Sequence, residues 1–103
     1  MKLENKVAIV TGASRGIGKA IALALAEERA NVVVVARSET EGRLPGTIHK
    51  TVEEIRALGG NALAVKTDVT KEDEVNEMVQ KTLDYYGRIN VLVNNTGLGR
   101  QSG

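Results

Sequence analysis

Short runs of mainly apolar residues occur at four places along the chain. They are three to five residues long and rich in valine, isoleucine and leucine, which predicts β-strands buried on both faces. The runs occupy residues 7–10, 32–35, 63–65 and 89–93. We therefore expect four strands, of which the third has the weakest pattern.

Apolar residues between these runs recur at the 3.6-residue spacing of amphipathic helices. The first helix begins near Ile17, and its expected apolar face comprises Ile17, Ala20, Ile21, Ala24 and Leu25. The second helix ends at Gly59, and the sequence leaves its start open between Thr47 and Thr51. The third begins at Thr70 and stops at Gly87. Residues 38–46 contain glycine and proline and predict a loop.

The resulting order is βαβαβαβ, which favours parallel strands joined by right-handed helical crossovers. We predict an α/β fold, the first half of a Rossmann-type doubly wound parallel sheet with strand order 3-2-1-4. This half-domain spans residues 1–97, and residues 98–103 form a glycine-rich tail that we interpret as a truncation point. Because no strand follows the fourth, we expect an exposed sheet edge that favours self-association, or association with the missing half.

Composition narrows the possible partners. Fourteen Lys and Arg against thirteen Asp and Glu give a net charge of +1, and aromatic residues make up 2%. These values argue against nucleic-acid and membrane-surface binding. The chain has no cysteine and no other metal-ligand spacing, so we predict no disulfide and no metal site. The N-terminal segment is too charged for a signal peptide, and we expect a soluble, cytoplasmic protein.

The segment from Thr11 to Gly18 reads T-G-A-S-R-G-I-G and joins the first strand to the first helix. Gly12 lets the chain leave the strand in a tight turn, Gly16 lets the backbone approach a phosphate, and Gly18 lets the helix pack close to the strand. The helix N-terminus then presents free amides to a pyrophosphate. The alternative is that the glycines only form a turn. The spacing G-x-x-x-G-x-G indicates nucleotide binding without specifying a reaction.

With this motif, the sequence resembles the short-chain dehydrogenase/reductase family over almost its whole length. Asp68-Val69 stands where the family keeps an aspartate that contacts adenine, and Asn94-Asn95-Thr96-Gly97 matches the family's N-N-A-G with threonine in place of alanine. The run of residues 44–48, L-P-G-T-I, is similar to the hydroxysteroid-dehydrogenase-like subgroup. The resemblance implies an oxidoreductase that transfers hydride between a nicotinamide dinucleotide and an alcohol or carbonyl substrate.

Other interpretations of these residues remain open from sequence alone. Asp68 precedes Thr70 and could instead cap the third helix. Asn94 and Asn95 could be ordinary turn residues, although in the family the first asparagine braces the central strands and the glycine leaves room for the cofactor. His49 is the single histidine of the sequence, and we interpret it as a solvated helix residue.

The end of the second strand indicates the choice of cofactor. NAD-binding folds place an acidic residue there to accept hydrogen bonds from the ribose, and this position aligns with Ala36. Arg37 follows it, and Arg15 lies in the glycine motif, as in NADP-dependent members of the family. We therefore predict NADP(H) over NAD(H). The alternatives are that Glu39 binds the ribose and selects NAD, or that both arginines are merely solvated.

The family's catalytic groups are a serine, a Tyr-x-x-x-Lys pair and a helical asparagine. Ile89 and Asn90 stand four residues after Tyr85 and Tyr86, so neither tyrosine begins that motif and we name no catalytic residue. We expect the cofactor-binding portion of an NADP(H)-dependent oxidoreductase that is inactive alone; the alternative is an inert nucleotide-binding or assembly module. The candidate cofactor-binding residues are Thr11, Gly12, Ser14, Arg15, Gly16, Ile17, Gly18, Arg37, Asp68, Val69, Asn95 and Gly97.

Overall fold

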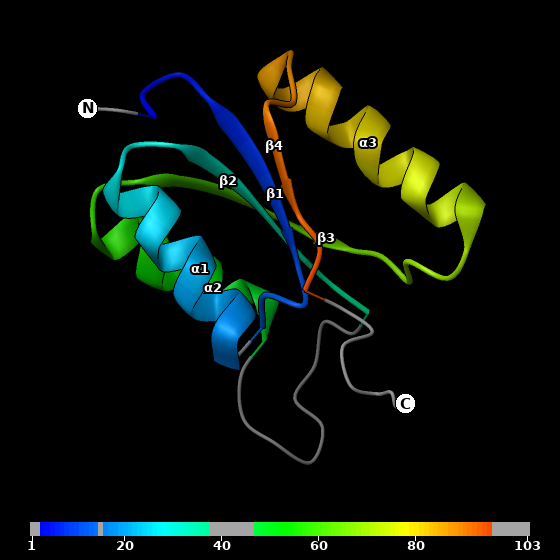
Figure 1. Ribbon diagram of the computed structural model, residues 1–103, viewed down its shortest axis with the longest axis horizontal. Coiled ribbons are helices and arrows are strands. Elements are labelled where there is room, and N and C mark those ends of the chain that lie inside the picture. Colours follow the sequence, from blue (N-terminus) through cyan, green and yellow to red (C-terminus); the bar gives the residue numbers. More distant parts are fainter. Residues whose placement is uncertain (1–2, 15, 38–46, 96–103) are drawn as a thin grey trace.

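The structure, a computed structural model of the 103-residue chain, describes residues 3–14, 16–37 and 47–95. Its elements are β1 (Val7–Thr11), α1 (Gly16–Glu27), β2 (Asn31–Ala36), α2 (Ile48–Ala57), β3 (Asn61–Lys66), α3 (Glu72–Tyr86) and β4 (Val91–Val93). The strands form one parallel sheet in the order β3-β2-β1-β4 (Figure 1). This confirms the predicted α/β fold, the first half of a Rossmann-like sheet.

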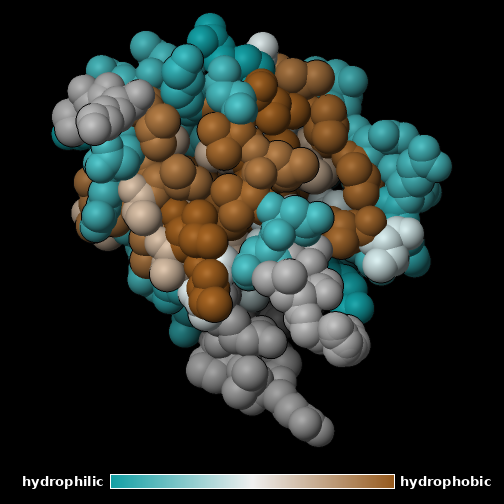
Figure 2. All heavy atoms as spheres, viewed as in Figure 1, coloured by the Kyte–Doolittle hydropathy of each residue, from teal (hydrophilic) through white to brown (hydrophobic). Residues whose placement is uncertain are grey.

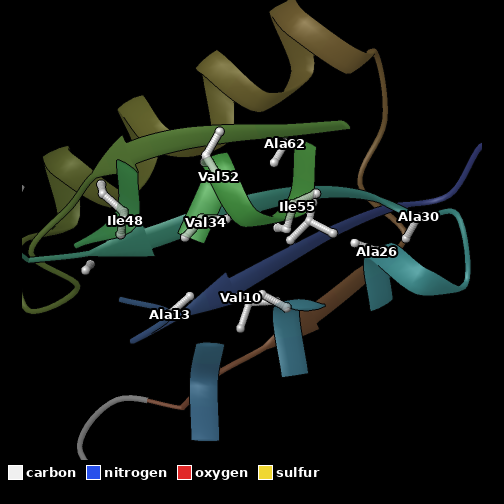
Figure 3. Packing of buried hydrophobic residues seen from close by; sticks show 12 residues of the cluster. Val10, Ala13, Ala26, Ala30, Val34, Ile48, Val52, Ile55 and Ala62 are labelled. Carbon is white, nitrogen blue, oxygen red and sulfur yellow. The ribbon is translucent and has the colours of Figure 1, made fainter. Parts of the chain in front are cut away.

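Helices cover both faces of the sheet. α1 and α2 lie on one face and α3 lies on the other (Figure 1). Figure 3 shows the hydrophobic cluster between the sheet and the first two helices; its labelled residues are Val10, Ala13, Ala26, Ala30, Val34, Ile48, Val52, Ile55 and Ala62. A second cluster joins the sheet to α3 and includes Met78. Two apolar layers explain why the strand sequences show no polar alternation.

β2 illustrates this arrangement most clearly. Val32 and Val34 belong to the cluster under α1 and α2, whereas Val33 and Val35 belong to the cluster under α3. Successive side chains of a strand point to opposite faces, so four consecutive valines serve both layers. All four are 0% exposed. The continuous apolar run therefore marks a strand with neighbours on both edges and helices on both faces.

α1 packs on the sheet through small residues, and this differs from the predicted apolar face. Its buried positions are Gly18, Ala22 and Ala26. They are spaced four residues apart, which places them on one side of a helix. Ile17 is 70% exposed, Ala20 and Ala24 are also exposed, and Ile21 and Leu25 are only partly buried. The predicted face is therefore wrong for Ile17, Ala20 and Ala24, whereas Ile21 and Leu25 pack against the cluster. Small side chains at the buried positions let the helix axis approach β1 closely.

Helix ends settle the boundaries that the sequence left open. Thr47 is the N-cap of α2, and its hydroxyl accepts a hydrogen bond of 3.1 Å from the Lys50 N–H. α3 begins at Glu72, two residues later than predicted, with Lys71 as its N-cap, and it stops as predicted at Gly87, whose φ is 83°.

β3 is longer and β4 is shorter than their apolar runs. β3 pairs with β2 along six register positions, which extends it beyond the predicted residues. Before β4, the Asn90 side-chain oxygen accepts a hydrogen bond of 2.8 Å from the Val7 N–H, while the Asn90 N–H donates to the Val7 carbonyl at 2.8 Å. A side chain therefore replaces part of the ladder, and regular pairing starts only at Val91.

The described part of the chain has neither a helix that is long and apolar enough to cross a membrane nor a group of three potential metal ligands. β4 pairs with β1 on one side, and its Leu92 is 62% exposed. Figure 2 shows hydrophobic residues gathered over the middle of the molecular face on which β4 lies. Self-association through this edge stays a prediction.

Candidate functional site

The predicted site lies at the carboxyl ends of the parallel strands. β1 ends at Thr11, and a turn of a few residues connects it to the N-terminus of α1 at Gly16 (Figure 1). In open α/β sheets, ligands bind beyond these strand ends. Gly12 has φ of 65°, a left-handed conformation that lets the chain turn directly out of the strand.

Gly18 allows the close contact between α1 and this turn. A Cβ at Gly18 would lie 2.0 Å from the Gly12 carbonyl oxygen and 2.8 Å from the Asn95 Nδ2 atom. No side chain fits this space, and Gly18 is itself buried. The close packing predicted for Gly18 from the motif is confirmed.

Gly16 has the opposite environment. Its φ is 63°, and nothing lies within 4 Å of the position that a Cβ would take. Gly16 is exposed and opens α1, whose first turn carries no acidic side chain. The backbone at the helix N-terminus is therefore accessible and free of acidic repulsion, which fits the pyrophosphate of a dinucleotide.

Thr11 connects the turn to the end of β4. Its side chain is buried, and its Oγ1 accepts a hydrogen bond of 2.9 Å from the Asn95 N–H. The same hydroxyl lies 3.3 Å from the Val93 carbonyl oxygen and 3.2 Å from Asn94 Oδ1, either of which can accept its proton. Asn95 Nδ2 also lies 3.5 Å from the Gly12 carbonyl oxygen. Both predicted asparagines are thus brought to the glycine turn.

Arg37 and Asp68 follow β2 and β3 at the same end of the sheet. The Thr67 N–H donates to the Ala36 carbonyl at 2.9 Å, which keeps the two strand ends together. The Asp68 carboxylate accepts hydrogen bonds from the Thr70 hydroxyl at 2.6 Å and the Thr70 N–H at 3.0 Å. These bonds, with smaller contributions from Lys71 and Arg37, lower the pKa of Asp68.

Asp68 does not cap α3. The N-cap is Lys71, which has no side-chain capping bond, and Asp68 instead closes a short turn onto Thr70. Its own N–H donates to Glu74 Oε1 at 2.9 Å, so the start of α3 is tied to the strand end. The capping interpretation was therefore wrong, because the helix begins too late for it. Adenine contact by Asp68 and Val69 stays a prediction, and Val69 is exposed.

Three residues named in the sequence analysis, Arg15, Glu39 and Gly97, lie outside the described residues. Tyr85 and Tyr86 lie at the end of α3, with their rings edge to face at 4.8 Å. Since α3 leads into the start of β4, this pair is at the end of the sheet opposite the glycine turn (Figure 1).

Two buried threonines near the site were not identified as functional from sequence. Thr51 lies in α2 and donates to the Ala13 carbonyl at 2.8 Å. Thr67 follows β3, and its buried hydroxyl has no hydrogen-bond partner in the described part of the chain. The sequence analysis considered Thr51 only as a possible start of the second helix. The signal for its contact is its position in the apolar phase of α2, between Ile48 and Ile55, where a hydroxyl needs a buried partner.

Comparison with known proteins identifies the family. The family model described as short chain dehydrogenase matches residues 6–103. Hydroxysteroid dehydrogenase-like protein 2 of Bos taurus is 46% identical over 95 residues, which cover 91% of this chain and 23% of that protein. The 3-oxoacyl-[acyl-carrier-protein] reductase of Synechocystis is 50% identical over 101 residues, which cover 97% of this chain and 38% of that protein.

Solved structures agree with this result. A short chain dehydrogenase from Mycobacterium thermoresistibile has a TM-score of 0.85 at 42% identity, covering 89% of this chain and 33% of that one. A metagenomic short-chain oxidoreductase in complex with NADP has a TM-score of 0.85 at 39% identity, covering 96% of this chain and 42% of that one. The chain therefore spans less than half the length of these relatives. With its glycine turn and strand order, it belongs to the short-chain dehydrogenase family, oxidoreductases that use a nicotinamide dinucleotide.

Proposed function

We propose that this chain is the cofactor-binding portion of an NADP(H)-dependent short-chain oxidoreductase. The observation that carries the proposal is the contrast between two glycines of one turn. Gly18 has no space for a side chain, whereas Gly16 faces open space at the start of α1. This pair brings helix and strand together while leaving the helix amides accessible, as a bound pyrophosphate requires.

The residues that would hold the cofactor follow the carboxyl ends of β1, β2 and β3. The glycine turn would bind the pyrophosphate through backbone amides, and Arg37, Asp68 and Val69 would surround the adenosine. Thr11 and Asn95 would keep the turn in place through their hydrogen bonds. When bound, the nicotinamide exchanges hydride with an alcohol or carbonyl carbon.

NADP(H) is favoured by the end of β2. Ala36 has no group that could accept hydrogen bonds from a ribose, and the exposed Arg37 follows it. A guanidinium matches phosphate geometry in a bidentate manner. A charged hydrogen bond contributes about 1.5–3 kcal/mol, roughly a 10- to 150-fold preference. The NADP complex of a relative at 39% identity supports the same choice.

Calorimetric titration with NADP⁺ and NAD⁺ tests both parts of this proposal. We expect the chain to bind NADP⁺ more tightly, Arg37→Ala to remove most of the preference, and Ala36→Asp to shift it towards NAD⁺. Gly16→Val should weaken the binding of both cofactors. Arg88→Ala is the control, because it removes an exposed arginine that precedes β4 at the other end of the sheet. Equal wild-type affinities, or an unchanged ratio in Arg37→Ala, would refute the NADP assignment.

We further propose that these 103 residues bind the cofactor without turning it over. Neither tyrosine is followed by lysine at the fourth position. Burial, with a smaller effect of Tyr85, raises the pKa of Tyr86 to about 12, away from the range that a general acid–base group needs at neutral pH. The test is NADPH oxidation with a panel of carbonyl substrates. Turnover by the purified chain would contradict this proposal and leave cofactor binding intact.

A further inference from the structure

Ala13, in the middle of the glycine turn, is held at both of its backbone polar groups. Its N–H donates to the Val35 carbonyl at 3.1 Å, and its carbonyl oxygen accepts from the Thr51 hydroxyl at 2.8 Å. Ala13 is 0% exposed and belongs to the hydrophobic cluster of Figure 3. Because Ala13 is buried, water cannot replace this hydrogen bond. Loss of the bond would leave a buried carbonyl without a partner, which is costly.

The Thr51 hydroxyl has a local alternative. A threonine inside a helix commonly donates to the carbonyl four residues earlier. The Thr47 carbonyl oxygen lies 3.3 Å from Thr51 Oγ1, whereas the Ala13 oxygen lies at 2.8 Å. A hydroxyl has one proton, and the shorter distance assigns it to Ala13. Thr51 is 0% exposed, so its side chain is fixed in this contact by packing.

A second contact joins α2 to the same region. Glu54, three residues after Thr51, forms a salt bridge with Lys19 at the start of α1. Residues three apart lie on the same side of a helix, so one side of α2 contacts both the turn and α1. The ion pair is partly exposed and contributes little energy. It nevertheless shows that this side of α2 lies against the first turns of α1.

We infer that Thr51 is a positioning residue for the phosphate-binding turn, an inference that rests on the proposed function. The Ala13 carbonyl and the Ser14 N–H belong to one planar trans peptide and point in roughly opposite directions. By holding the carbonyl towards the buried side, Thr51 directs the Ser14 N–H towards the open side of the turn. That amide is one of the donors that a pyrophosphate would use.

The test compares Thr51→Val, which keeps the shape and removes the hydroxyl, with Thr51→Ser, which keeps the hydroxyl. With NADP⁺ as the calorimetric probe, we expect Kd to rise about tenfold in Thr51→Val and to stay within about twofold in Thr51→Ser. Thr82→Val is the matched control, because Thr82 is also 0% exposed and its hydroxyl donates within α3, to the Met78 carbonyl. We expect no change in its Kd.

A second measurement separates positioning from general loosening. In the free chain, the ¹⁵N order parameter of the Ser14 amide should fall from about 0.85 towards about 0.6 in Thr51→Val, and should not change in Thr82→Val. If Thr51→Val folds poorly, Thr51→Ala and Thr51→Ser give the same comparison, since only the hydroxyl distinguishes them. Unchanged Kd and order parameter in the variant without the hydroxyl would overturn the inference, as would equal changes in Thr82→Val. Failure of the wild-type chain to bind NADP⁺ would refute the proposed function, and the order parameter would then decide the role of Thr51.

Discussion

Replacing Gly18 by alanine adds a single methyl group at the most crowded point of the nucleotide turn. Its carbon would lie 2.0 Å from the Gly12 carbonyl oxygen and 2.7 Å from the carbonyl carbon. Favourable contacts between such atoms lie near 3.5 Å, so α1 and the turn that follows β1 must separate by about 1.5 Å locally. The obstacle is main chain, which cannot move aside as the end of a flexible side chain would.

The two effects of this substitution have opposite signs. Alanine is the better helix former, and by propensity alone the variant would gain about 1 kcal/mol. Overpacking of a rigid contact costs typically about 1–3 kcal/mol, and here we expect the upper end of that range. We therefore expect Gly18→Ala to lower the free energy of unfolding by about 2 kcal/mol, a lowering of Tm by roughly 8–16 °C.

Urea unfolding followed by circular dichroism measures this difference. Gly59→Ala and Gly87→Ala are suitable controls, because both glycines have positive φ and no atom within 4 Å of the added carbon. The loss in free energy of unfolding of these two controls measures backbone strain alone, about 1 kcal/mol. Gly18→Ala should lose at least ~1 kcal/mol more than either of them. A variant as stable as the wild type would refute the reasoning and show that α1 is free to move away from the turn that follows β1.

Three further predictions concern stability. Thr67→Val should raise the free energy of unfolding by about 1 kcal/mol, because it removes a buried hydroxyl to which no described residue is hydrogen-bonded, whereas Thr82→Val should not; urea titration of the pair distinguishes them. The folded-state pKa of Tyr86, about 12, lies above the ordinary tyrosine value of 10.0. The contribution of Tyr86 to stability is therefore fully present below pH 10 and is lost as pH rises from 10 to 12. Tyr86→Phe should flatten that decrease in unfolding curves recorded across the range. Arg29 has φ of 75° at the end of α1, and Arg29→Gly should raise Tm by removing about 1 kcal/mol of left-handed strain; an unchanged or lower Tm would contradict this.

The sheet and much of the site follow from local sequence patterns. Four valines in succession indicate that β2 is an inner strand of a doubly covered sheet. The strand order followed from the match of the βαβαβαβ pattern to the first half of a dinucleotide-binding fold. The roles of Gly12 and Gly18 follow from the motif, because a tight turn and a close helix contact each require glycine. Thr47 was one of two possible caps, and only the hydrogen bond to the Lys50 N–H decides between them.

Features that depend on distant contacts did not follow from sequence. Both faces of α1 have helical spacing, and the choice of Gly18 over Ile17 as a buried residue depends on the approach of the Gly12 carbonyl. The partner of Thr51 lies 38 residues earlier in the chain, where no local pattern indicates it. The start of β4 depends on Asn90, whose side chain bonds to Val7 across 83 residues.

The position of β4 has a consequence for the order of folding. β1 pairs with β2 between residues 24 apart, such as Val7 and Asn31, whereas its pairing with β4 joins residues 83 apart, such as Ala8 and Val91. Closing the longer loop costs about 1 kcal/mol more in chain entropy, so β4 is expected to dock last. The hydrogen bond from the Asn95 N–H to Thr11 forms only after that step. The nucleotide turn therefore acquires its final geometry late in folding, after the sheet that supports it has formed.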